Sequence, residues 1–578
     1  MAVELIRADP LSFSRVISHV ISLDALPETA KALSDGANIL ARAAKRVIID
    51  MRAPNGTVQL AEDLPLRHLK EAAGRPQKLI CHGNIFRDIG FDGKSSMLGW
   101  VVPPSWQQVE RFLARALQMR PLIHKQNFIF CGTGAWAFSV GALRDLVHTK
   151  RNSITISILG SLDPQGLSNL LSSLDLSTTV CIGISQSGTT LETIMLMETL
   201  RDCFDGAGLS YREHFLWLTD SSRSPEDVRS GEDSIRASRG HDWEKVNILP
   251  LDVGDHADIN ALFCVPHSSL FFMAMALGHR GDASAVRHMY VQYIKLADDI
   301  ARSVVPIADH VASNRIEDFQ MDLAEIASPN LENLIIQLIA QSLGSKQHGF
   351  NPRMHFASGV TPHATYLELP IPAEIPPLVK AMLTMYALSV FVAVVAYHRD
   401  ISFVTHPKVN LYKQKAKDLL TTMLLSGERG TSPDISSPGT ITDQIRLHLD
   451  RHSQTRFVDI VVYGIVPTVH RLRVRDLLAS YLRSRASEPE VQISVVHGSD
   501  WNHSAYQRAV QAEDSLYVIL ELQKYRMSVE GVSELRISEN VAMLRAIARG
   551  TYETLRAKAL YFVVDETFFQ CGDFVERG

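Results

Sequence analysis

Residues 179–193, TVCIGISQSGTTLET, decide the fold of this chain. The first six, Thr179 to Ile184, are mostly apolar or β-branched, which predicts a buried strand of a parallel sheet. A turn from Ser185 to Thr190 follows, and the next residues, Leu191 to Arg201, have the pattern of an amphipathic helix. A buried strand that leads through a tight turn into a helix is one unit of an α/β fold.

The turn is also a candidate phosphate site. Four of its six residues carry hydroxyls, and Gly188 lets the backbone approach a ligand closely. The hydroxyls stand where the free N–H groups and the positive end of the helix dipole point outward, which suits a phosphate monoester. The predicted phosphate-binding residues are Ser185, Gln186, Ser187, Thr189 and Thr190. The alternative is an ordinary helix cap, because capping favours the same residue types.

Composition narrows the class of protein. With 578 residues the chain is long enough for two or three domains, and 46% hydrophobic and 21% charged residues are typical of a soluble globular protein. The net charge is −5 and there is no basic stripe, so neither nucleic acid nor a membrane surface is expected as a partner. The apolar run Ala381–Tyr397 is shorter than a membrane span requires and predicts a buried helix.

Cysteine usage and the N-terminus indicate the compartment. The six cysteines show no CxxC spacing, which favours reduced thiols over disulfides or a zinc site. The first residues, MAVELIRADPLSF, lack the basic start and apolar run of a signal peptide. We therefore expect a cytoplasmic protein.

Strands and helices alternate in two parts of the chain, which predicts parallel sheets. The expected strands are Asn127–Cys131, Ile154–Leu159, Thr179–Ile184 and His214–Leu218 in the first part, and Arg456–Tyr463, Val491–His497, Ser515–Leu522 and Leu560–Val564 in the second. The helices expected beside them are Trp136–His148, Asp163–Leu174, Leu191–Arg201 and Ser538–Arg556. Between the two parts, residues 260–400 are expected to be mostly helical.

This pattern divides the chain into four expected regions. They are a mixed N-terminal segment (1–100), a first α/β domain with the phosphate loop (101–320), a helical region with a linker (321–440) and a second α/β domain (441–578). The linker, Ser426–Thr440, is rich in Gly, Ser and Pro and is expected to be mobile. A ligand cleft is expected between the two α/β domains, beyond the carboxyl ends of the strands.

Four segments, in this order along the chain, resemble the glucose-6-phosphate isomerases of the sugar isomerase (SIS) fold. They are SQSGTTLET (185–193), QLIAQSLGSKQHG (337–349), ISFVTHPKVNLYK (401–413) and HGSDWNHSAYQ (497–507). These segments most resemble the bacterial form of the family that elsewhere occurs fused to transaldolase. The resemblance implies an α/β fold with two SIS-type doubly wound parallel-sheet domains joined by helices. It also implies a homodimer that acts on a small-molecule sugar phosphate, with neither cofactor nor metal.

The resemblance also assigns roles to residues. It implies that His503 and Lys413 assist opening of the sugar ring. Gln341 stands where the family has the glutamate that moves a proton between C1 and C2, and a carboxamide cannot accept a proton near neutral pH. Asp258 stands where the family has an arginine that stabilises the enediolate, and a carboxylate there would repel an oxyanion.

Further departures surround these positions. Gln186 replaces a lysine of the phosphate loop, and the segment GTGAW (132–136) has Trp136 where the family has a serine. His406 stands in place of a glutamine, and Gln507 ends the segment that contains His503.

Other interpretations of these residues stay open at this stage. Lys413 lies among three lysines that share a helix, so it could belong to a solvated face. His497, Asp500 and His503 could form a metal site, although two histidines six residues apart on a loop are a weak ligand pattern. Gln341 could be aligned wrongly, with Glu332 or Glu325 in the site instead.

The leading hypothesis is an aldose–ketose isomerase of glucose-6-phosphate isomerase ancestry that acts through an enediolate. The alternatives are a sugar-phosphate-binding protein without turnover, and an enzyme redirected to a different sugar-phosphate reaction. All three share one fold, because fold does not fix function.

Overall fold

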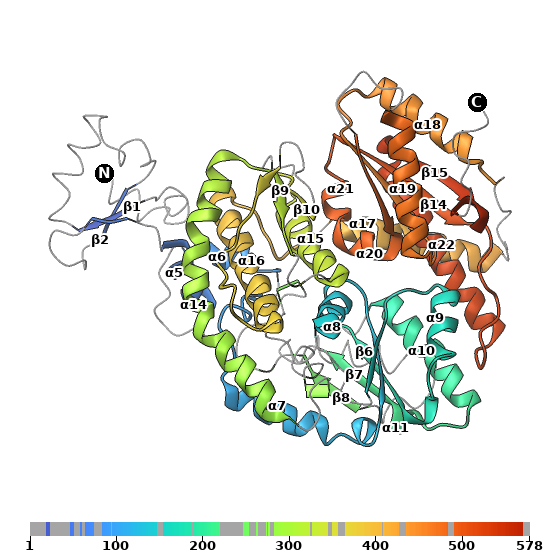
Figure 1. Cartoon of the computed structure of the whole chain (residues 1–578), viewed down its shortest axis with the longest axis horizontal. Coiled ribbons are helices and arrows are strands. Elements are labelled where there is room, and N and C mark those ends of the chain that lie inside the picture. The colour runs from blue at the N-terminus through green and yellow to red at the C-terminus, as the bar shows by residue number, and fades with distance from the viewer. Residues whose placement is uncertain are drawn as a thin grey trace.

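The structure is a computed structural model of the chain. It describes residues 19–22, 47–50, 58–60, 64–73, 84–93, 95–146, 154–186, 190–219, 247–251, 253, 262–263, 273, 276–277, 282–323, 326, 328–344, 350–356, 364–406, 408–426, 435–483 and 491–569. Two α/β parts and a helical part lie side by side (Figure 1).

The first α/β part contains a five-stranded sheet whose strands are all parallel. In spatial order they are β5 (Thr155–Leu159), β4 (Asn127–Cys131), β6 (Thr179–Ile184), β7 (Phe215–Thr219) and β8 (Asn247–Pro250). The four strands predicted here are confirmed to within one residue at each end. The fifth, β8, was not predicted.

Both faces of this sheet are buried, as the alternation along β4 shows. Phe128 and Phe130 pack into the core of the helical part, whereas Ile129 and Cys131 pack into the core shared with the second α/β part. Successive side chains of a strand point to opposite faces, so the apolar sequence of β4 satisfies both cores.

Helices flank this sheet and connect its strands. They are α8 (Ala135–Leu146), α9 (Pro164–Leu171), η4 (Leu176–Thr178), α10 (Leu191–Gly206) and α11 (Tyr211–His214). Helix α9 begins where Asp163 accepts a hydrogen bond from the backbone N–H of Gln165 and Pro164 fills the first helical position. It ends at Leu171 rather than at the predicted Leu174.

The second α/β part contains a four-stranded sheet, again all parallel. In spatial order its strands are β13 (Gln492–His497), β12 (Phe457–Tyr463), β14 (Ser515–Leu522) and β15 (Ala559–Val564). In both sheets the second strand in the chain lies at the edge, followed in space by the first, the third and the fourth, as β5, β4, β6 and β7 do in the first sheet. The predicted α/β fold class with parallel sheets is therefore confirmed.

The helices of the second part are α18 (Pro438–Arg451), α19 (Thr468–Arg483), α20 (Gly498–Ser504), α21 (Tyr506–Ala509), α22 (Glu534–Leu555), η8 (Arg556–Lys558) and η9 (Glu566–Phe569). Helix α17 (Val409–Ser426) comes before them in the chain and lies along α22. Most of the linker predicted at 426–440 lies outside the described residues.

Polar contacts between α10 and α22 join the two α/β parts. The Arg536 guanidinium lies 3.0 Å from the Glu198 carboxylate and 3.3 Å from that of Asp202, and Asn540 donates a 2.9 Å hydrogen bond to Thr199. Because Arg536 and Glu198 are both largely buried, this contact fixes the two parts more firmly than an exposed ion pair would.

The helical part is centred on α14 (Ala283–Asn314), α15 (Pro329–Leu343) and α16 (Pro377–Arg399). Residues from Leu378 to Tyr397 are almost all buried, so the predicted buried helix is confirmed. By length and composition α16 is the one helix among the described residues that could span a membrane, and 94% of its most apolar window is buried inside the protein.

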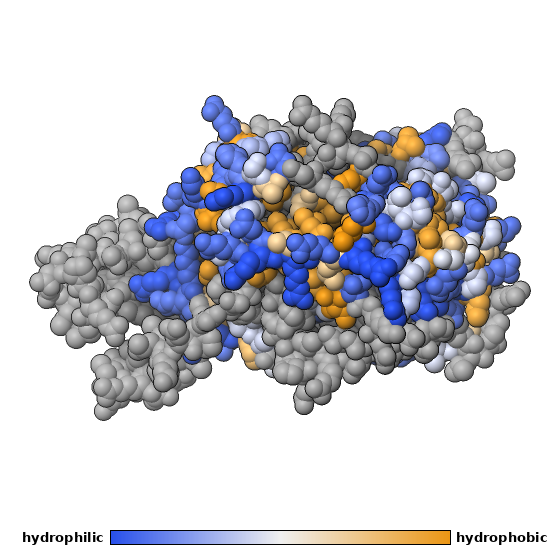
Figure 2. All heavy atoms as spheres, turned by 90° about the horizontal axis from the view of Figure 1, so that it is seen from below, coloured by the Kyte–Doolittle hydropathy of each residue, from blue (hydrophilic) through white to orange (hydrophobic). Residues whose placement is uncertain are grey.

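Smaller elements complete the structure. The helices α5 (Leu64–Ala73), α6 (Phe86–Ile89), α7 (Trp106–Leu117) and η2 (Arg120–Leu122) precede the first sheet. Two three-stranded sheets were not predicted: β1 (His19–Ser22), β2 (Val47–Asp50) and β3 (Val58–Leu60), and β9 (Asp318–Met321), β10 (Arg353–Phe356) and β11 (Thr365–Tyr366). Seen from below, apolar residues gather over the middle of the molecule, between hydrophilic margins (Figure 2).

Candidate functional site

Three segments converge at Gly134, just beyond the carboxyl end of β4. Its φ of 64° favours glycine, and a side chain there would begin 3.1 Å from the Gln337 amide nitrogen and 3.2 Å from the Cβ of His503. Gln337 comes from α15 and His503 from α20, so the first sheet, the helical part and the second sheet all contribute to this place. The site lies at the carboxyl ends of parallel strands, where ligands of α/β folds bind.

The phosphate loop begins at the neighbouring strand end. Ser185 is buried, its hydroxyl donates to the Thr190 hydroxyl at 3.0 Å, and it accepts a 3.4 Å hydrogen bond from the Thr190 backbone N–H. The Gln186 carbonyl accepts from the Thr219 hydroxyl at 3.2 Å. Ser187 and Thr189 lie outside the described residues.

Thr190 occupies the position before α10 without capping the helix through its side chain. Its hydroxyl accepts from Ser185 instead, so the cap interpretation does not account for this hydroxyl. In the first turn of α10 the Glu192 carboxylate accepts a hydrogen bond from its own backbone N–H. The positive end of the helix dipole favours an anion beside this turn.

Glu192, in the first turn of α10, faces His503 across the junction between the two sheets. The Glu192 carboxylate lies 3.4 Å from the His503 ring nitrogen Nε2, and each residue is only 8% exposed. Burial alone would raise the pKa of Glu192, but the His503 imidazole and the positive charge of Lys413 outweigh it and hold this pKa below its usual value. The buried pair is thus a carboxylate beside an imidazole, an arrangement that can relay a proton.

A buried hydrogen-bond network next to His503 in the chain fixes the position of its helix. Its neighbour Asn502 accepts a hydrogen bond from the Tyr463 hydroxyl and donates a 2.8 Å hydrogen bond to Thr551. The Tyr463 hydroxyl also contacts Thr551 at 3.0 Å. Because all three are buried, this network anchors α20 to β12 and α22.

Gln341 lies in the last turn of α15, one turn beyond Gln337. The Gln337 amide donates a 2.8 Å hydrogen bond to the Gln341 carbonyl, and both side chains are buried. Glu332 precedes Gln341 by nine residues on the same helix, about 13 Å along its axis, and lines a different cavity. Glu332 therefore does not take the place of Gln341, and Glu325 lies outside the described residues.

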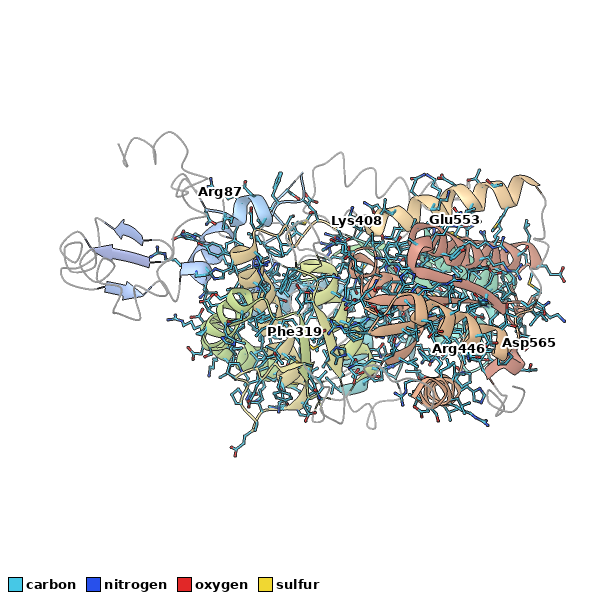
Figure 3. All side chains as sticks on the ribbon, turned by 90° about the horizontal axis from the view of Figure 1, so that it is seen from above. Arg87, Phe319, Lys408, Arg446, Glu553 and Asp565 are labelled. Atoms are coloured by element: carbon cyan, nitrogen blue, oxygen red, sulfur yellow. The ribbon has the colours of Figure 1, made fainter. Side chains whose placement is uncertain are left out.

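Lys413 is exposed, in the second turn of α17, and its charge acts on both Glu192 and His406. The neighbouring Lys415 instead pairs with Glu553 at 2.9 Å. Figure 3 shows Lys408, which directly precedes α17, and Glu553 on the same side of the molecule. Lys413 thus differs from a lysine of a purely solvated face.

His406 and Gln507 lie beside these residues. Burial lowers the pKa of His406 to about 4, the Gln341 backbone opposes this shift, and the charge of Lys413 adds to it. Gln507 accepts from the Lys408 N–H at 3.2 Å and donates to the Gly344 carbonyl at 3.4 Å. Its amide therefore links the end of α15 to the start of α17.

The structure brings together most of the predicted site residues and leaves others undescribed. His503, Gln341, Lys413, His406, Ser185 and Thr190 lie at one junction, whereas Asp258 lies outside the described residues. Trp136 packs into the core of the helical part. Within the described ranges, no group of three or more His, Cys, Asp or Glu side chains could hold a metal ion, so the cluster of His497, Asp500 and His503 does not form one.

Sequence reasoning missed Glu192 and Gln337. Glu192 belongs to the quoted TLET segment, but an acidic residue in the first turn of a helix is common for dipole reasons alone. Gln337 lies four residues before Gln341, a spacing that puts both amides on one helix face and could have revealed it.

Comparison with known proteins supports the resemblance. No family model matches the chain. A glucose-6-phosphate isomerase of Desulfitobacterium hafniense is 28% identical over 120 residues, 20% of this chain and 22% of that protein. One of Thermus thermophilus is 26% identical over 188 residues, 31% of this chain and 42% of that protein. This chain resembles glucose-6-phosphate isomerases.

The similarity covers only part of each relative, about a fifth of the length of the Desulfitobacterium protein. Among solved structures, a glucose-6-phosphate isomerase of Chlamydia trachomatis matches with a TM-score of 0.41 and 13% identity, over 69% of this chain and 83% of that one.

Proposed function

We propose that this protein binds a sugar phosphate and opens its ring, as an isomerase-type enzyme whose aldose–ketose step is impaired. The observation that carries the proposal is the buried Glu192–His503 pair, which spans the two sheets next to the phosphate loop. Gln341 stands where a catalytic carboxylate would be expected from the resemblance, and the Gln337 amide donates a hydrogen bond to it.

Phosphate capture is assigned to the loop after β6. The Ser185 and Thr190 hydroxyls and the N-terminus of α10 offer neutral donors and a favourable dipole to a dianion. Ser187 and Thr189 are proposed to complete the contacts.

Ring opening is assigned to His503. This step moves a proton from the anomeric hydroxyl and returns one to the ring oxygen, and an imidazole with a carboxylate behind it can do both. Glu192 orients the ring and stabilises its protonated form. Lys413 supplies a positive charge on the same side of the site, where it can help to orient the sugar.

The isomerisation step requires removal of a proton from carbon. Gln341 cannot accept that proton, and its carbonyl already accepts a hydrogen bond from Gln337. The Glu192 carboxylate is engaged with His503, so it does not simply replace the missing base. We therefore expect slow aldose–ketose interconversion and a much faster exchange of anomers.

A second candidate function is sugar-phosphate binding without turnover. The Gln337–Gln341 hydrogen bond favours it, because this bond occupies the Gln341 side-chain carbonyl at the position where the resemblance places the catalytic base.

Anomer exchange of fructose 6-phosphate and of glucose 6-phosphate, followed by NMR, separates these candidates. We expect acceleration by the wild type and a large loss in His503→Gln, with His497→Gln as the control on the same segment. Binding by the wild type without any acceleration would establish the second candidate.

The assembly and the division into domains are also proposals. We infer a cytoplasmic homodimer from the resemblance, and two SIS-type domains at 101–320 and 441–578 around the helical region at 321–440. Sedimentation velocity tests the dimer, since a single species of monomer mass would contradict it.

A further inference from the structure

A second cavity lies apart from the candidate active site, against the second sheet. It has a volume of about 200 Å³ and lies beside an outer compartment of about 480 Å³ that shares part of its lining. The residues that line both compartments are Ile336, Arg353, Met354, His355, Asp459 and Ser494. Together the compartments are large enough for a small metabolite.

The cavity shares two helices with the candidate site but uses other faces of them. On α15 it is lined by Asn333, Ile336 and Ala340, whereas Gln337 and Gln341 face the site. On α20 it is lined by Asp500, Trp501 and Ser504, whereas His503 turns to Glu192.

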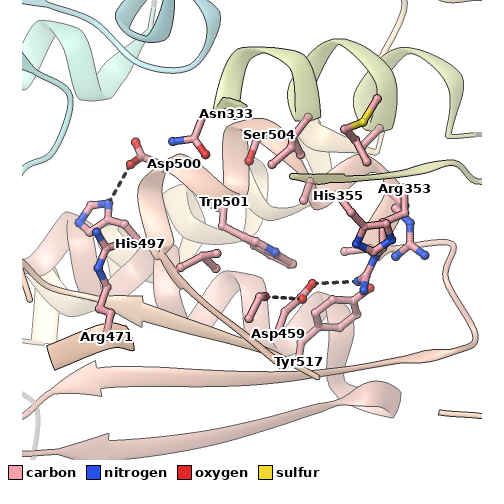
Figure 4. Close-up of a pocket in the computed structure, with 18 residues that line it drawn as sticks. Asn333, Arg353, His355, Asp459, Arg471, His497, Asp500, Trp501, Ser504 and Tyr517 are labelled. Atoms are coloured by element: carbon pink, nitrogen blue, oxygen red, sulfur yellow. Dashed lines mark hydrogen bonds and ion pairs between the residues drawn. The ribbon is translucent and has the colours of Figure 1, made fainter. Parts of the chain in front are cut away.

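Figure 4 shows how the labelled side chains surround this cavity, with Trp501 lying across its middle and Tyr517 below. His497 and Arg471 stand on one side, Arg353 and His355 on the other.

The Asp459 carboxylate at the floor of the cavity already has a partner on each oxygen. The Asp459 carboxylate accepts a 2.6 Å hydrogen bond from Ser494 through one oxygen and pairs with Arg353 at 3.4 Å through the other. Arg353 also stacks over the Phe457 ring at 3.5 Å from its centre. A buried carboxylate that is satisfied on both oxygens has little to offer a ligand.

The donors, by contrast, are in excess. The Trp501 indole N–H, the Tyr517 hydroxyl and the Arg508 Nε–H are buried and have no hydrogen-bond partner among the described residues. These three residues are at most 5% exposed. The other two nitrogens of the Arg508 guanidinium are engaged, one with the Ser515 hydroxyl at 3.4 Å and one with the Asp514 carboxylate at 3.5 Å. Burial raises the pKa of Tyr517 to about 12, so its hydroxyl keeps its proton at neutral pH. Buried donors without partners are costly, and a ligand that supplies acceptor oxygens would satisfy them.

We propose that this cavity binds a small oxyanion, carried on a carboxylate or phosphate group, through Trp501, Tyr517 and Arg508. Three arginines line it, Arg353, Arg471 and Arg508. Arg353 pairs with Asp459 and Arg508 with Asp514, so the unpartnered N–H and O–H donors, rather than a surplus of charge, favour an anionic acceptor. Since α15 and α20 also carry Gln341 and His503, a ligand here contacts the elements that shape the candidate active site.

The test is calorimetric titration of the full chain with inorganic phosphate and, separately, with malonate. Both are run on the wild type and on Ser185→Ala/Thr190→Val, which disables the phosphate loop. We expect binding of at least one anion to persist in the loop variant, and the tighter of the two assigns the phosphate or the carboxylate class.

Trp501→Phe and Tyr517→Phe remove a donor each and keep the ring. Each is expected to weaken the remaining binding about tenfold. Trp100→Phe is the matched control, because Trp100 is buried in another core and its indole N–H has no hydrogen-bond partner within the described part of the chain.

A second readout guards against misfolding. Quenching of tryptophan fluorescence by the anion should disappear in Trp501→Phe and persist in Trp100→Phe. The proposal is overturned if neither anion binds the loop variant, or if the Trp501→Phe/Tyr517→Phe double variant binds as the wild type does. Neither result bears on whether the phosphate loop binds a sugar phosphate.

Discussion

The two α/β parts have the same strand order, yet the loops at corresponding strand ends differ in a way that assigns function to one of them. After β6, the Ser185 hydroxyl donates a hydrogen bond to the Thr190 hydroxyl. The Thr190 side chain makes no capping hydrogen bond to the N-terminus of α10. After β14, Ser533 caps α22 by accepting from the Arg536 N–H at 3.3 Å.

The loop after β14 is also closed by its own side chains. Tyr525 is 8% exposed, and its hydroxyl donates a 2.7 Å hydrogen bond to the Tyr463 carbonyl. Arg545 donates to the Gln523 carbonyl at 2.8 Å. In the first sheet the N-cap side chain of α10 makes no capping hydrogen bond, whereas in the second sheet the N-cap side chain of α22 does. The second sheet contributes His503 to the first sheet's site instead.

The largest expected effect comes from restoring a base. Gln341→Glu should increase the rate of aldose–ketose isomerisation a hundred- to ten-thousandfold, because general base catalysis contributes about that much. Coupled assays of fructose 6-phosphate conversion measure it. Gln337→Glu, one helical turn away, is the matched control and should increase this rate much less. Equal increases of the isomerisation rate in the two variants would contradict the assignment of Gln341 to the position of the catalytic base.

The next effect concerns the carboxylate behind the histidine. Glu192→Gln should slow anomer exchange about a hundredfold, since His503 loses the group that orients it and stabilises its charge. Glu534→Gln, in the first turn of the corresponding helix α22, should change nothing. If both variants exchange anomers at the wild-type rate, the pair is structural only.

The phosphate loop should show a smaller effect. Ser185→Ala and Thr190→Val should each weaken sugar-phosphate binding by about 1–3 kcal/mol, measured by calorimetry, because each removes a contact to a charged group. Ser533→Ala, at the cap of α22, should instead lower the free energy of unfolding by about 1 kcal/mol and leave affinity unchanged. The opposite pattern would reverse the roles of the two loops.

The smallest effect is on stability in mild acid. The pKa of His406 is lowered to about 4 by burial, against about 6.5 in an unfolded chain. Between these values the unfolded chain binds a proton that the folded chain does not, so stability falls as the pH drops from 6.5 toward 4. His406→Gln should remove about 1–2 kcal/mol of the loss between pH 7 and pH 5 in urea unfolding. His310→Gln, at an exposed position, should leave the pH dependence unchanged.

The fold could be predicted where the sequence is locally decisive. Strands β4 and β6 are short apolar runs followed by glycine-containing turns, and both sheets of the prediction depend on such runs. Strands β9 to β11 could not be predicted, because they have two to four residues each, too few for a periodic pattern, and lie between long helices.

The site could be predicted only as far as its motifs extend. His503 and Lys413 belong to segments that resemble a family, whereas the Glu192–His503 pair joins residues more than three hundred positions apart. The second cavity was beyond sequence reasoning altogether, because its lining combines α15, β10, β12, β13 and α20.

The most direct test of the central claim is carbon-bound hydrogen exchange. Fructose 6-phosphate is incubated with the wild-type protein in deuterium oxide, and NMR follows both anomer exchange and deuterium at C1. We predict accelerated anomer exchange with little label at C1, and rapid labelling in Gln341→Glu. Rapid deuterium incorporation at C1 by the wild type would show that a working base is present and would contradict the account.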